Sequence, residues 1–555
     1  MPGKPTARQG PVSFRVTSAS LTDATTLSGT ALLVLQVAAV LIVIAALPYQ
    51  VFQLDRFTVL KELVLHLAAL TAALLCLAFA RRLTVFMVDV PLVGFLALSI
   101  LSTLLAENGW LAFRALGVSL SGAVLFWCGR TLARAGRSQA LLVALALAVV
   151  LGALTALAQA YGLVTTSLAS LSRAPGGTFG NRNFMAHLVT IGLPVLLLVS
   201  VESRSRAGFV LGSIGVMLAA AALVLSRSRA AWVGAAVCGA FLAIEGLWVG
   251  RLWADDRLRR RVLRLATTAA AGLVLSLILP NRLNWRSNSP YLDSLTGVAN
   301  YREGSGRGRL IQYGNTLAMA VHHPIFGVGP GNWPVAYPRF MSPGDPSFHI
   351  GDIIPTNPWP SSDWMAMLAE RGFVALILLA LVGGSLTLGA WARLRRGPRD
   401  TPALTDLTIV ATLIAIGTVG AFDAVMLLPV NTLFGWTIVG ALASSARPLR
   451  EIRLNARSRR YLMLAAAAVG TLFLWRSSAQ VLAMGLFSTG QRAAMERASR
   501  VDPGSYRIHM LLAENWRAAG RCDRARPHAE AARSLFPNYP APRQVLRVCG
   551  SRKQK

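Results

Sequence analysis

The stretch "SRAPGGTFGNRNFMAHLVTIGLPVLLL", Ser172 to Leu198, joins a glycine-rich segment with two arginines directly to an apolar run. The apolar run has the length and composition of a membrane-spanning helix. Guanidinium groups are costly at the edge of hydrocarbon, so they extend toward water, pair with an acid or bind an anion. Arg173 and Arg182 therefore mark the mouth of this helix as a candidate functional site.

The composition of the whole chain agrees with a membrane protein. Of its 555 residues, 54% are hydrophobic and 14% are charged. These values favour an all-α polytopic membrane protein over a set of soluble domains. The net charge of +31 could suggest a nucleic-acid partner, but the arginines lie between apolar segments and no recognition motif accompanies them. We therefore expect membrane lipids, and no nucleic acid, around this chain.

Apolar segments that can cross about 30 Å of hydrocarbon predict about 13 transmembrane helices. They begin near Thr30, Val59, Val85, Leu111, Gln139, Asn183, Ala207, Arg229, Val262, Trp364, Leu404, Val425 and Tyr461. The first lacks a small-residue cleavage site and is interpreted as a retained helix. The predicted order is an N-terminal segment (1–29), a first bundle of about nine helices (30–280), a long loop (281–363), further transmembrane helices (364–480) and a helical tail (481–555).

The short loops between the spans differ strongly in charge. If the N-terminus is cytoplasmic, every heavy basic cluster falls on the inner side, including "RLWADDRLRRR" from Arg251 and "RPLREIRLNARSRR" from Arg447. This distribution follows the positive-inside rule. We therefore expect a cytoplasmic N-terminus, with the long loop and the C-terminal tail on the outer face.

A second set of arginines is predicted on that outer face. Arg173 and Arg182 flank the glycine segment, Arg227 and Arg229 lie in "SRSRAAW", and Arg309 lies in the long loop. Arginine grips phosphate oxygens with two parallel hydrogen bonds, and glycines let backbone N–H groups approach them. The set therefore predicts a site for a lipid-linked diphosphate. The alternatives are contact with lipid head groups, or ion pairs with acids such as Asp293, Glu303 or Asp363.

Four segments carry a family resemblance: "GGTFGNRNFMAHL", "SRSRAAWVG", "GRGRLIQYGNTLAMAVHHPIFGVGPGNWPVAYP" and "LAERGFVALI". In this order they resemble the O-antigen ligase and O-antigen polymerase superfamily of bacterial inner membranes, from about Leu141 to Ser445. The resemblance implies a membrane glycosyltransferase that takes a glycan from an undecaprenyl-diphosphate donor at the periplasmic face. The acceptor would be lipid A core, a growing glycan or a protein hydroxyl, and no metal or other cofactor is expected.

The resemblance also implies site residues. The diphosphate-binding arginines of the family would map onto Arg182 or Arg173, Arg229 or Arg227, and Arg309. In many members a His-Asn pair precedes the span with the "AExG" signature, and its histidine is the proposed base or acceptor-orienting group. Here Ser361 takes the place of that histidine. This difference leaves open which group replaces it, or whether the chemistry has been lost.

Candidate replacements lie nearby: Asp363, His322, His323 and His349. A positioned carboxylate or histidine that accepts the proton of an attacking hydroxyl contributes about 10²–10⁴-fold. We predict Asp363, His323 and Glu370 as candidate catalytic residues. Each has a structural alternative: a helix N-terminal residue for Asp363, a turn residue for His323, and a salt-bridge partner for Glu370.

The tail after Ser488 has the pattern of soluble amphipathic helices. Ala498 recurs as Ala532 and Pro503 as Pro537, each 34 residues later, which resembles a tetratricopeptide repeat. A tail with so few repeats is only marginally stable by itself. We therefore expect it to dock on the outer loop or to bind a protein partner. Cys522 and Cys549 could form a disulfide in an oxidising compartment or remain free thiols.

Two other classes of function remain open. A transporter or flippase of lipid-linked sugars would also need outer arginines, but it should carry ionisable residues deep within several helices and often internal repeats. The sequence shows few deep charges and no repeat of its halves. An inactive scaffold for polysaccharide assembly would use the tail for recruitment and would explain the missing histidine.

Overall fold

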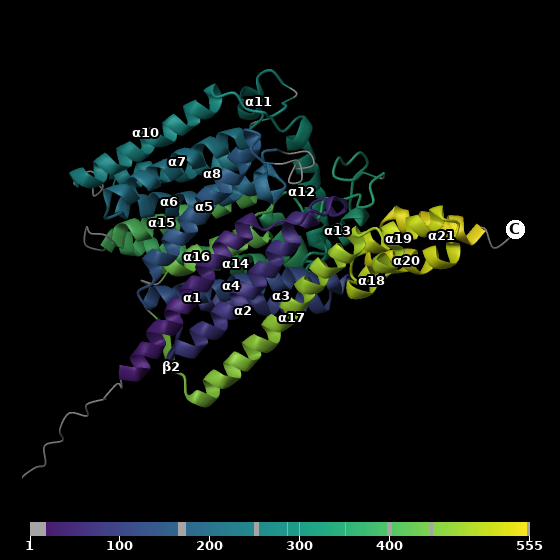
Figure 1. Ribbon diagram of the computed structural model, residues 1–555, viewed down its shortest axis with the longest axis horizontal. Helices are drawn as coiled ribbons and strands as arrows, with labels where there is room; N and C mark the ends of the chain where they lie inside the picture. Colours follow the sequence, from purple (N-terminus) through teal and green to yellow (C-terminus); the bar gives the residue numbers. More distant parts are fainter. Residues whose placement is uncertain are drawn as a thin grey trace, which may run out of the picture.

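The computed structural model describes residues 18–164, 174–248, 255–285, 287–298, 300–349, 351–396, 402–443 and 448–551. Arg173 lies outside the described residues, so its role stays a prediction. The described chain is all-α apart from one two-stranded sheet. Figure 1 shows a large bundle of helices with a smaller group, α18 to α21, at one end.

Each expected span coincides with one helix of the bundle. The bundle helices are α1 (Ser18–Ile44), α2 (Asp55–Phe79), α3 (Asp89–Leu104), α4 (Gly109–Arg134), α5 (Ser138–Ala160), α6 (Arg182–Glu202), α7 (Arg206–Ser226), α8 (Arg229–Trp248), α10 (Asp256–Ile278), α14 (Asp363–Arg396), α15 (Pro402–Phe422), α16 (Pro429–Leu442) and α17 (Ala456–Ser488). Ten of the described helices are long and apolar enough to cross a membrane, while α3 and α16 are shorter apolar helices. The predicted all-α polytopic fold is confirmed.

The remaining elements lie in the loops and the tail. The loop elements are η1 (Gln50–Phe52), η3 (Gly177–Phe179), α11 (Pro290–Thr296), α12 (Gly304–His322), α13 (Trp333–Ala336) and η4 (Tyr337–Arg339). The tail elements are α18 (Arg492–Val501), α19 (Tyr506–Ala518), α20 (Cys522–Leu535) and α21 (Pro540–Ser551).

The two ends of the bundle differ. At one end, β1 (Arg82–Val85) pairs antiparallel with β2 (Arg450–Arg453), and Glu451 contacts Arg82 at 2.8 Å and Arg134 at 3.4 Å. The sequence pattern predicts no strands here, because these segments are short and one of them is highly charged. The long loop and the tail lie together at the opposite end (Figure 1), which we call the loop end. The face of the membrane that this end occupies stays a prediction.

Helix α14 is interrupted at Gly372, which has a φ of 86° and a ψ of 173°. The loop before α13 fills the interruption. The amide of Gly329 donates to the carbonyl of Glu370 at 3.0 Å, and the amide of Phe373 donates to the carbonyl of Pro324 at 2.9 Å. Two of the segments that carry the family resemblance, "HHPIFGVGPGNW" and "LAERGF", are thus interlocked.

The glycine segment before α6 is a compact, buried turn. Gly180 has a φ of 68°, and a Cβ there would lie 2.1 Å from the ring of Phe57. The amide of Gly177 donates to Oε1 of Gln159 at 2.7 Å. Close packing therefore accounts for these two glycines, since only glycine combines this backbone conformation with such close contact. The segment fixes the start of α6 at Arg182.

The tail has its own small core and docks on the loop end. Ile508, Ala513 and Ala529 are buried between its helices. The side-chain amide of Asn538 donates to the carbonyl of Val335 at 2.8 Å, and that of Asn108 donates to the carbonyl of Leu535 at 3.0 Å. The tail therefore contacts the long loop, one of the two expected outcomes. Its assignment to the tetratricopeptide kind stays a prediction.

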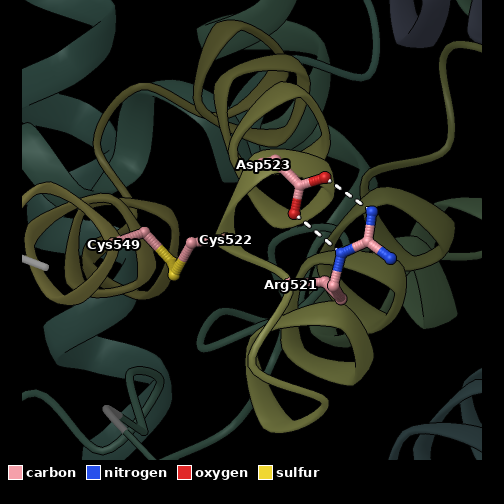
Figure 2. The surroundings of a disulfide bond; sticks show 4 residues. All are labelled: Arg521, Cys522, Asp523 and Cys549. Carbon is pink, nitrogen blue, oxygen red and sulfur yellow. Dashed lines mark hydrogen bonds and ion pairs between the residues drawn. A yellow bond between two sulfur atoms is a disulfide. The ribbon is translucent and has the colours of Figure 1, made fainter. Parts of the chain in front are cut away.

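A disulfide joins Cys522 to Cys549 and ties the start of α20 to the end of α21 (Figure 2). Beside it, Arg521 donates to both oxygens of Asp523, at 3.1 and 2.8 Å. Of the two alternatives for these cysteines, the structure selects the disulfide. The disulfide therefore links the two helices of the α20–α21 hairpin covalently.

Candidate functional site

Four of the predicted arginines gather at the loop end. Arg182 is the first residue of α6 and Arg229 is the first residue of α8. Both helices present their N-termini there, and the partial positive charge of a helix N-terminus attracts anions. Arg227 precedes α8 in a left-handed conformation with a φ of 51°, and Arg309 lies on α12.

Arg182 and Arg227 share one aromatic ring. Their guanidinium carbons lie 5.2 and 4.5 Å from the ring centroid of Trp285. Arg227 also donates from Nε to the hydroxyl of Ser294 at 2.8 Å. Partial burial lowers the pKa of Arg227, and the nearby Asp293 raises it again. The long loop thus holds the two arginines in fixed positions by ring contact and a neutral hydrogen bond.

Arg229 and Arg309 line one small hollow, together with Gly297 and Phe422. Arg229 hydrogen-bonds to the carbonyl of Gly297 and the hydroxyl of Ser305, both neutral groups. The two arginines repel each other electrostatically. A bound anion would remove that repulsion, so the pair is suited to a ligand with several negative charges.

Arg227, Arg229 and Arg309 differ from several arginines of the bundle that are paired with acids. Arg130 binds Asp89 at 2.8 Å, and Arg114 binds Glu62 at 2.8 Å. Within the described part of the chain, no salt bridge joins Arg227, Arg229 or Arg309 to a carboxylate. The ion-pair alternative with Asp293, Glu303 or Asp363 is therefore not what the structure shows for these three residues.

A carboxylate nevertheless lies close to the arginine set. Asp423 accepts a hydrogen bond from the side-chain amide of Asn183 at 3.0 Å, and Nε2 of the buried His187 lies 3.7 Å from the same oxygen. Its other oxygen accepts from the amide of Ala424 at 2.9 Å. Asn183 is the neighbour of Arg182, and Asp423 follows Phe422 of the hollow. Asp423 thus contacts the neighbour of Arg182 and adjoins a residue that lines the hollow of Arg229 and Arg309.

Asp423 is not among the site residues predicted from the sequence. A signal was present, because an acid in the turn between two spans lies at the same end as the arginines. Its approach to α6 depends on the packing of α15 against α6, which the sequence does not reveal.

Of the three predicted catalytic residues, Asp363 has both oxygens occupied. They accept from the amides of Val425 and Met426, each at 2.8 Å, and the side chain is buried. Asp363 is also the first residue of α14. Its place at the start of α14 matches its structural alternative as a helix N-terminal residue. The two hydrogen bonds also hold the turn between α15 and α16 against α14. Its role as a base stays a prediction.

Glu370 and His323 have different surroundings. The Glu370 carboxylate is buried, lies 3.7 Å from Arg371, and faces the amides of Gly331 and Trp333. It therefore anchors the loop that interlocks with α14. His323 is exposed after the end of α12, with its ring 6.4 Å from that of Phe340. Neither contact brings these residues to the arginine set, and their catalytic roles stay predictions.

The position of the missing family histidine is near Asp423. The hydroxyl of Tyr313 lies 2.6 Å from the carbonyl oxygen of Ser361 and 3.0 Å from that of Ala421. Burial raises the pKa of Tyr313 to about 12, while Arg309 lowers it. Tyr313 therefore stays protonated and links Ser361 to the turn that carries Asp423. Among the described residues, no group of three or more His, Cys, Asp or Glu side chains could hold a metal ion.

Comparisons with known proteins agree with the resemblance noted from the sequence. Residues 214–380 match a family model described as O-antigen ligase. The matched segment contains Arg227, Arg229 and Arg309, the long loop and Glu370, and it ends within α14. A search of the curated proteins finds no match for the chain. Residues 214–380 are therefore similar to the O-antigen ligase family, which supports a relationship of this part of the chain to the O-antigen ligase and polymerase superfamily.

Proposed function

We propose that this protein is a membrane glycosyltransferase that takes a glycan from an undecaprenyl-diphosphate donor at the periplasmic face. The observation that carries the proposal is the set of Arg182, Arg227, Arg229 and Arg309 at the loop end, where two helix N-termini also meet. A diphosphate is a multiply charged anion, and several arginines can bind its oxygens at once. The match of residues 214–380 to the O-antigen ligase family supports a lipid-linked glycan as the ligand.

Two observations support a periplasmic location of the loop end. The disulfide between Cys522 and Cys549 belongs to the tail, and disulfides persist in oxidising compartments such as the bacterial periplasm. The basic loops lie at the other end, in accord with the positive-inside rule. The N-terminus would then be cytoplasmic and the C-terminus periplasmic.

The reaction needs a group that accepts a proton. The acceptor hydroxyl attacks the anomeric carbon, the bond from that carbon to the diphosphate oxygen breaks, and the undecaprenyl diphosphate leaves with the electron pair. The arginines stabilise the negative charge of the leaving group. We infer that Asp423 takes the proton of the hydroxyl, because its carboxylate accepts from Asn183, next to Arg182, and it follows Phe422, which lines the hollow of Arg229 and Arg309. Asn183 and His187 would orient it.

Asp363 and Glu370 would then act as positioning residues. Asp363 holds the backbone just after Asp423, through the amides of Val425 and Met426. Glu370 holds the loop that fits into the interruption of α14. Both carboxylates would therefore affect the transfer through the shape of the site.

The direct test is glycan transfer by the purified protein in detergent, with an undecaprenyl-diphosphate oligosaccharide as donor. Lipid A core, free glycan and a protein hydroxyl serve as the three classes of acceptor, and the product distinguishes ligase from polymerase activity. We expect transfer by the wild type and its loss in Arg229→Ala. Arg206→Ala, at the basic end of α7, is the matched control. Donor binding without transfer to any acceptor would instead favour a transporter or a scaffold.

A further inference from the structure

A cavity of about 210 Å³ lies between the bundle and the tail, apart from the arginine set. Its bundle side includes Glu62 of α2 and Arg114 of α4, and its tail side includes Asp502 and Tyr506. None of the four arginines of the set lines it. The cavity is therefore a second candidate site, with the tail as one of its walls.

Two arginines of this cavity are neutralised by carboxylates, while Arg507 hydrogen-bonds to the neutral carbonyl of Val51 and Oε1 of Gln53. Arg114 donates two hydrogen bonds to the Glu62 carboxylate, both at 2.8 Å, and lies 3.8 Å from Asp55. Arg476 donates to Asp502 at 2.8 Å. An added anion would compete with carboxylates that are already in place. The cavity thus favours a neutral ligand, in contrast to the arginine set.

Polar atoms without partners mark the same cavity. Oε1 of Gln480, the hydroxyl of Tyr506, and Nε of Arg476 and Arg507 are buried and have no hydrogen-bonding partner among the described residues. Gln480 is 7% exposed and Tyr506 is 3% exposed. A buried polar atom without a partner is destabilising, so such atoms usually meet a ligand or water. Here they offer both donors and an acceptor.

Aromatic rings complete the lining and place the cavity near the arginine set. Trp359 and Tyr506 both line it. The ring of Trp359 lies 6.0 Å from that of Phe184, which is two positions after Arg182 on α6. An aromatic face packs against C–H groups, while hydroxyl and amide groups form hydrogen bonds with hydroxyls. Together these groups suit a neutral polyhydroxylated molecule.

We propose that this cavity binds a neutral sugar unit and that the tail supplies one wall of the site. The cavity is smaller than the roughly 300–1,000 Å³ of sites for drug-sized ligands, so it suits about one sugar unit. The assignment of this sugar to the acceptor rests on the proposed glycosyltransferase function. The tail then belongs to the substrate site itself.

Binding is measured with the full-length protein in detergent by saturation-transfer NMR. The probes are the methyl glycosides of glucose, galactose, N-acetylglucosamine and rhamnose, with inorganic pyrophosphate as the charged comparison. We expect at least one glycoside to bind, and Gln480→Leu and Tyr506→Phe each to weaken it about fivefold, as the loss of one hydrogen bond does. Tyr461→Phe, a 64% exposed tyrosine on α17, is the matched control. Arg229→Ala should leave glycoside binding unchanged.

Two results would contradict the proposed sugar site: no glycoside binds to the wild type, or both cavity variants bind the glycoside as tightly as the wild type does. A transfer assay separates this inference from the proposed function. Cavity variants should raise KM for the acceptor and leave KM for the donor unchanged. Transfer with an unchanged acceptor KM contradicts the acceptor assignment. Glycoside binding that depends on Tyr506, without any transfer, contradicts the proposed function and leaves the sugar site intact.

Discussion

The side-chain amide of Asn183 donates to the Asp423 carboxylate at 3.0 Å, although 240 positions separate the two residues in the chain. The bond joins the start of α6, where Arg182 lies, to the turn after α15. Nε2 of His187 lies 3.7 Å from the same oxygen. One hydrogen bond from α6 thus fixes the carboxylate near the start of this helix, with the buried imidazole of His187 close by. A carboxylate held in a fixed position is a candidate for a base.

Replacing Asp423 by asparagine tests the proposed base. We expect Asp423→Asn to lower kcat for transfer by about 10²–10⁴-fold, because the amide cannot accept the proton of the attacking hydroxyl. Donor affinity should change little. Steady-state kinetics with saturating donor measure both. An unchanged kcat would exclude Asp423 as the base.

Asp363→Asn is the comparison for that measurement. Both Asp363 oxygens accept backbone hydrogen bonds, and the amide nitrogen of asparagine cannot accept one. We expect a lower thermal unfolding midpoint together with partial activity in the folded fraction. If the folded fraction of Asp363→Asn lost all activity while Asp423→Asn retained it, the two roles would be exchanged.

Replacing Arg229 by lysine tests how the arginine set binds the donor. Lysine keeps the charge but loses the planar fork that holds two oxygens at once. We expect Arg229→Lys to weaken the binding of undecaprenyl diphosphate by about tenfold, which corresponds to roughly 1.4 kcal/mol, and Arg229→Ala to weaken it further. The binding isotherm in detergent is the measurement. Equal affinities for wild type and Arg229→Ala would remove this residue from the site.

The bundle could be predicted from the sequence because the length of an apolar run is a local property. Every expected span coincides with a helix. The two short strands could not be predicted in the same way, since "REIR" at Arg450 has no apolar alternation and pairs with a segment far away in the chain. The interruption at Gly372 was also missed, because "LAERGFVALI" reads as one continuous helix and only the inserted loop requires the break.

Some residues of the candidate site could likewise be predicted from the sequence, and others could not. Arg182, Arg227, Arg229 and Arg309 could be selected because arginines on the less basic face are unexpected for any membrane protein. Asp423 could not be ranked above Asp363, since both follow or begin a span and only their contacts distinguish them. The pairing of Glu62 with Arg114 across α2 and α4 likewise needs the fold. The bundle therefore buries more charged residues than the sequence pattern indicates.

Gly372 tests the interlock between α14 and the loop before α13. A Cβ at this position would lie 2.2 Å from the carbonyl oxygen of Ile325, in a backbone conformation that L side chains rarely adopt. We expect Gly372→Ala to destabilise the fold by at least about 1–3 kcal/mol. Gly383→Ala on the same helix is the control, because a Cβ there has no atom within 4 Å. Unfolding midpoints in detergent that do not differ between the two variants would contradict the role of Gly372.

The disulfide between Cys522 and Cys549 predicts a thiol count and a stability change. The chain has 5 cysteines, and the described structure leaves Cys76, Cys128 and Cys238 free. Thiol titration in nonreducing denaturant should therefore find these and no others. Replacing both tail cysteines by serine should destabilise the tail by about 3–4 kcal/mol, given the 27-residue separation of the pair. Protease cleavage within α20 or α21 that is no faster in the double variant would contradict this expectation.

The stability of the tail should depend on pH through His509. Burial lowers the pKa of His509, and His528 lowers it further. The carbonyl of Pro503 and the carboxylates of Asp502 and Glu496 raise this pKa and so oppose the shift. The folded tail therefore binds fewer protons than the unfolded tail, so its stability is complete above the ordinary histidine pKa of 6.5 and falls as the pH drops below it. The Nδ1 atoms of His509 and His528 lie 3.2 Å apart, so one of the two nitrogens must accept a hydrogen bond from the other.

Hydrogen exchange of α19 and α20 peptides in the intact protein measures this dependence, after correction for the intrinsic effect of pH on exchange. We expect less protection at about pH 5.5 than at about pH 8. His509→Gln should remove much of the difference, because glutamine does not titrate. His349→Gln, in the exposed part of the long loop, should leave it unchanged. Equal protection of the wild-type tail at both pH values would show that protonation of His509 is not coupled to tail folding.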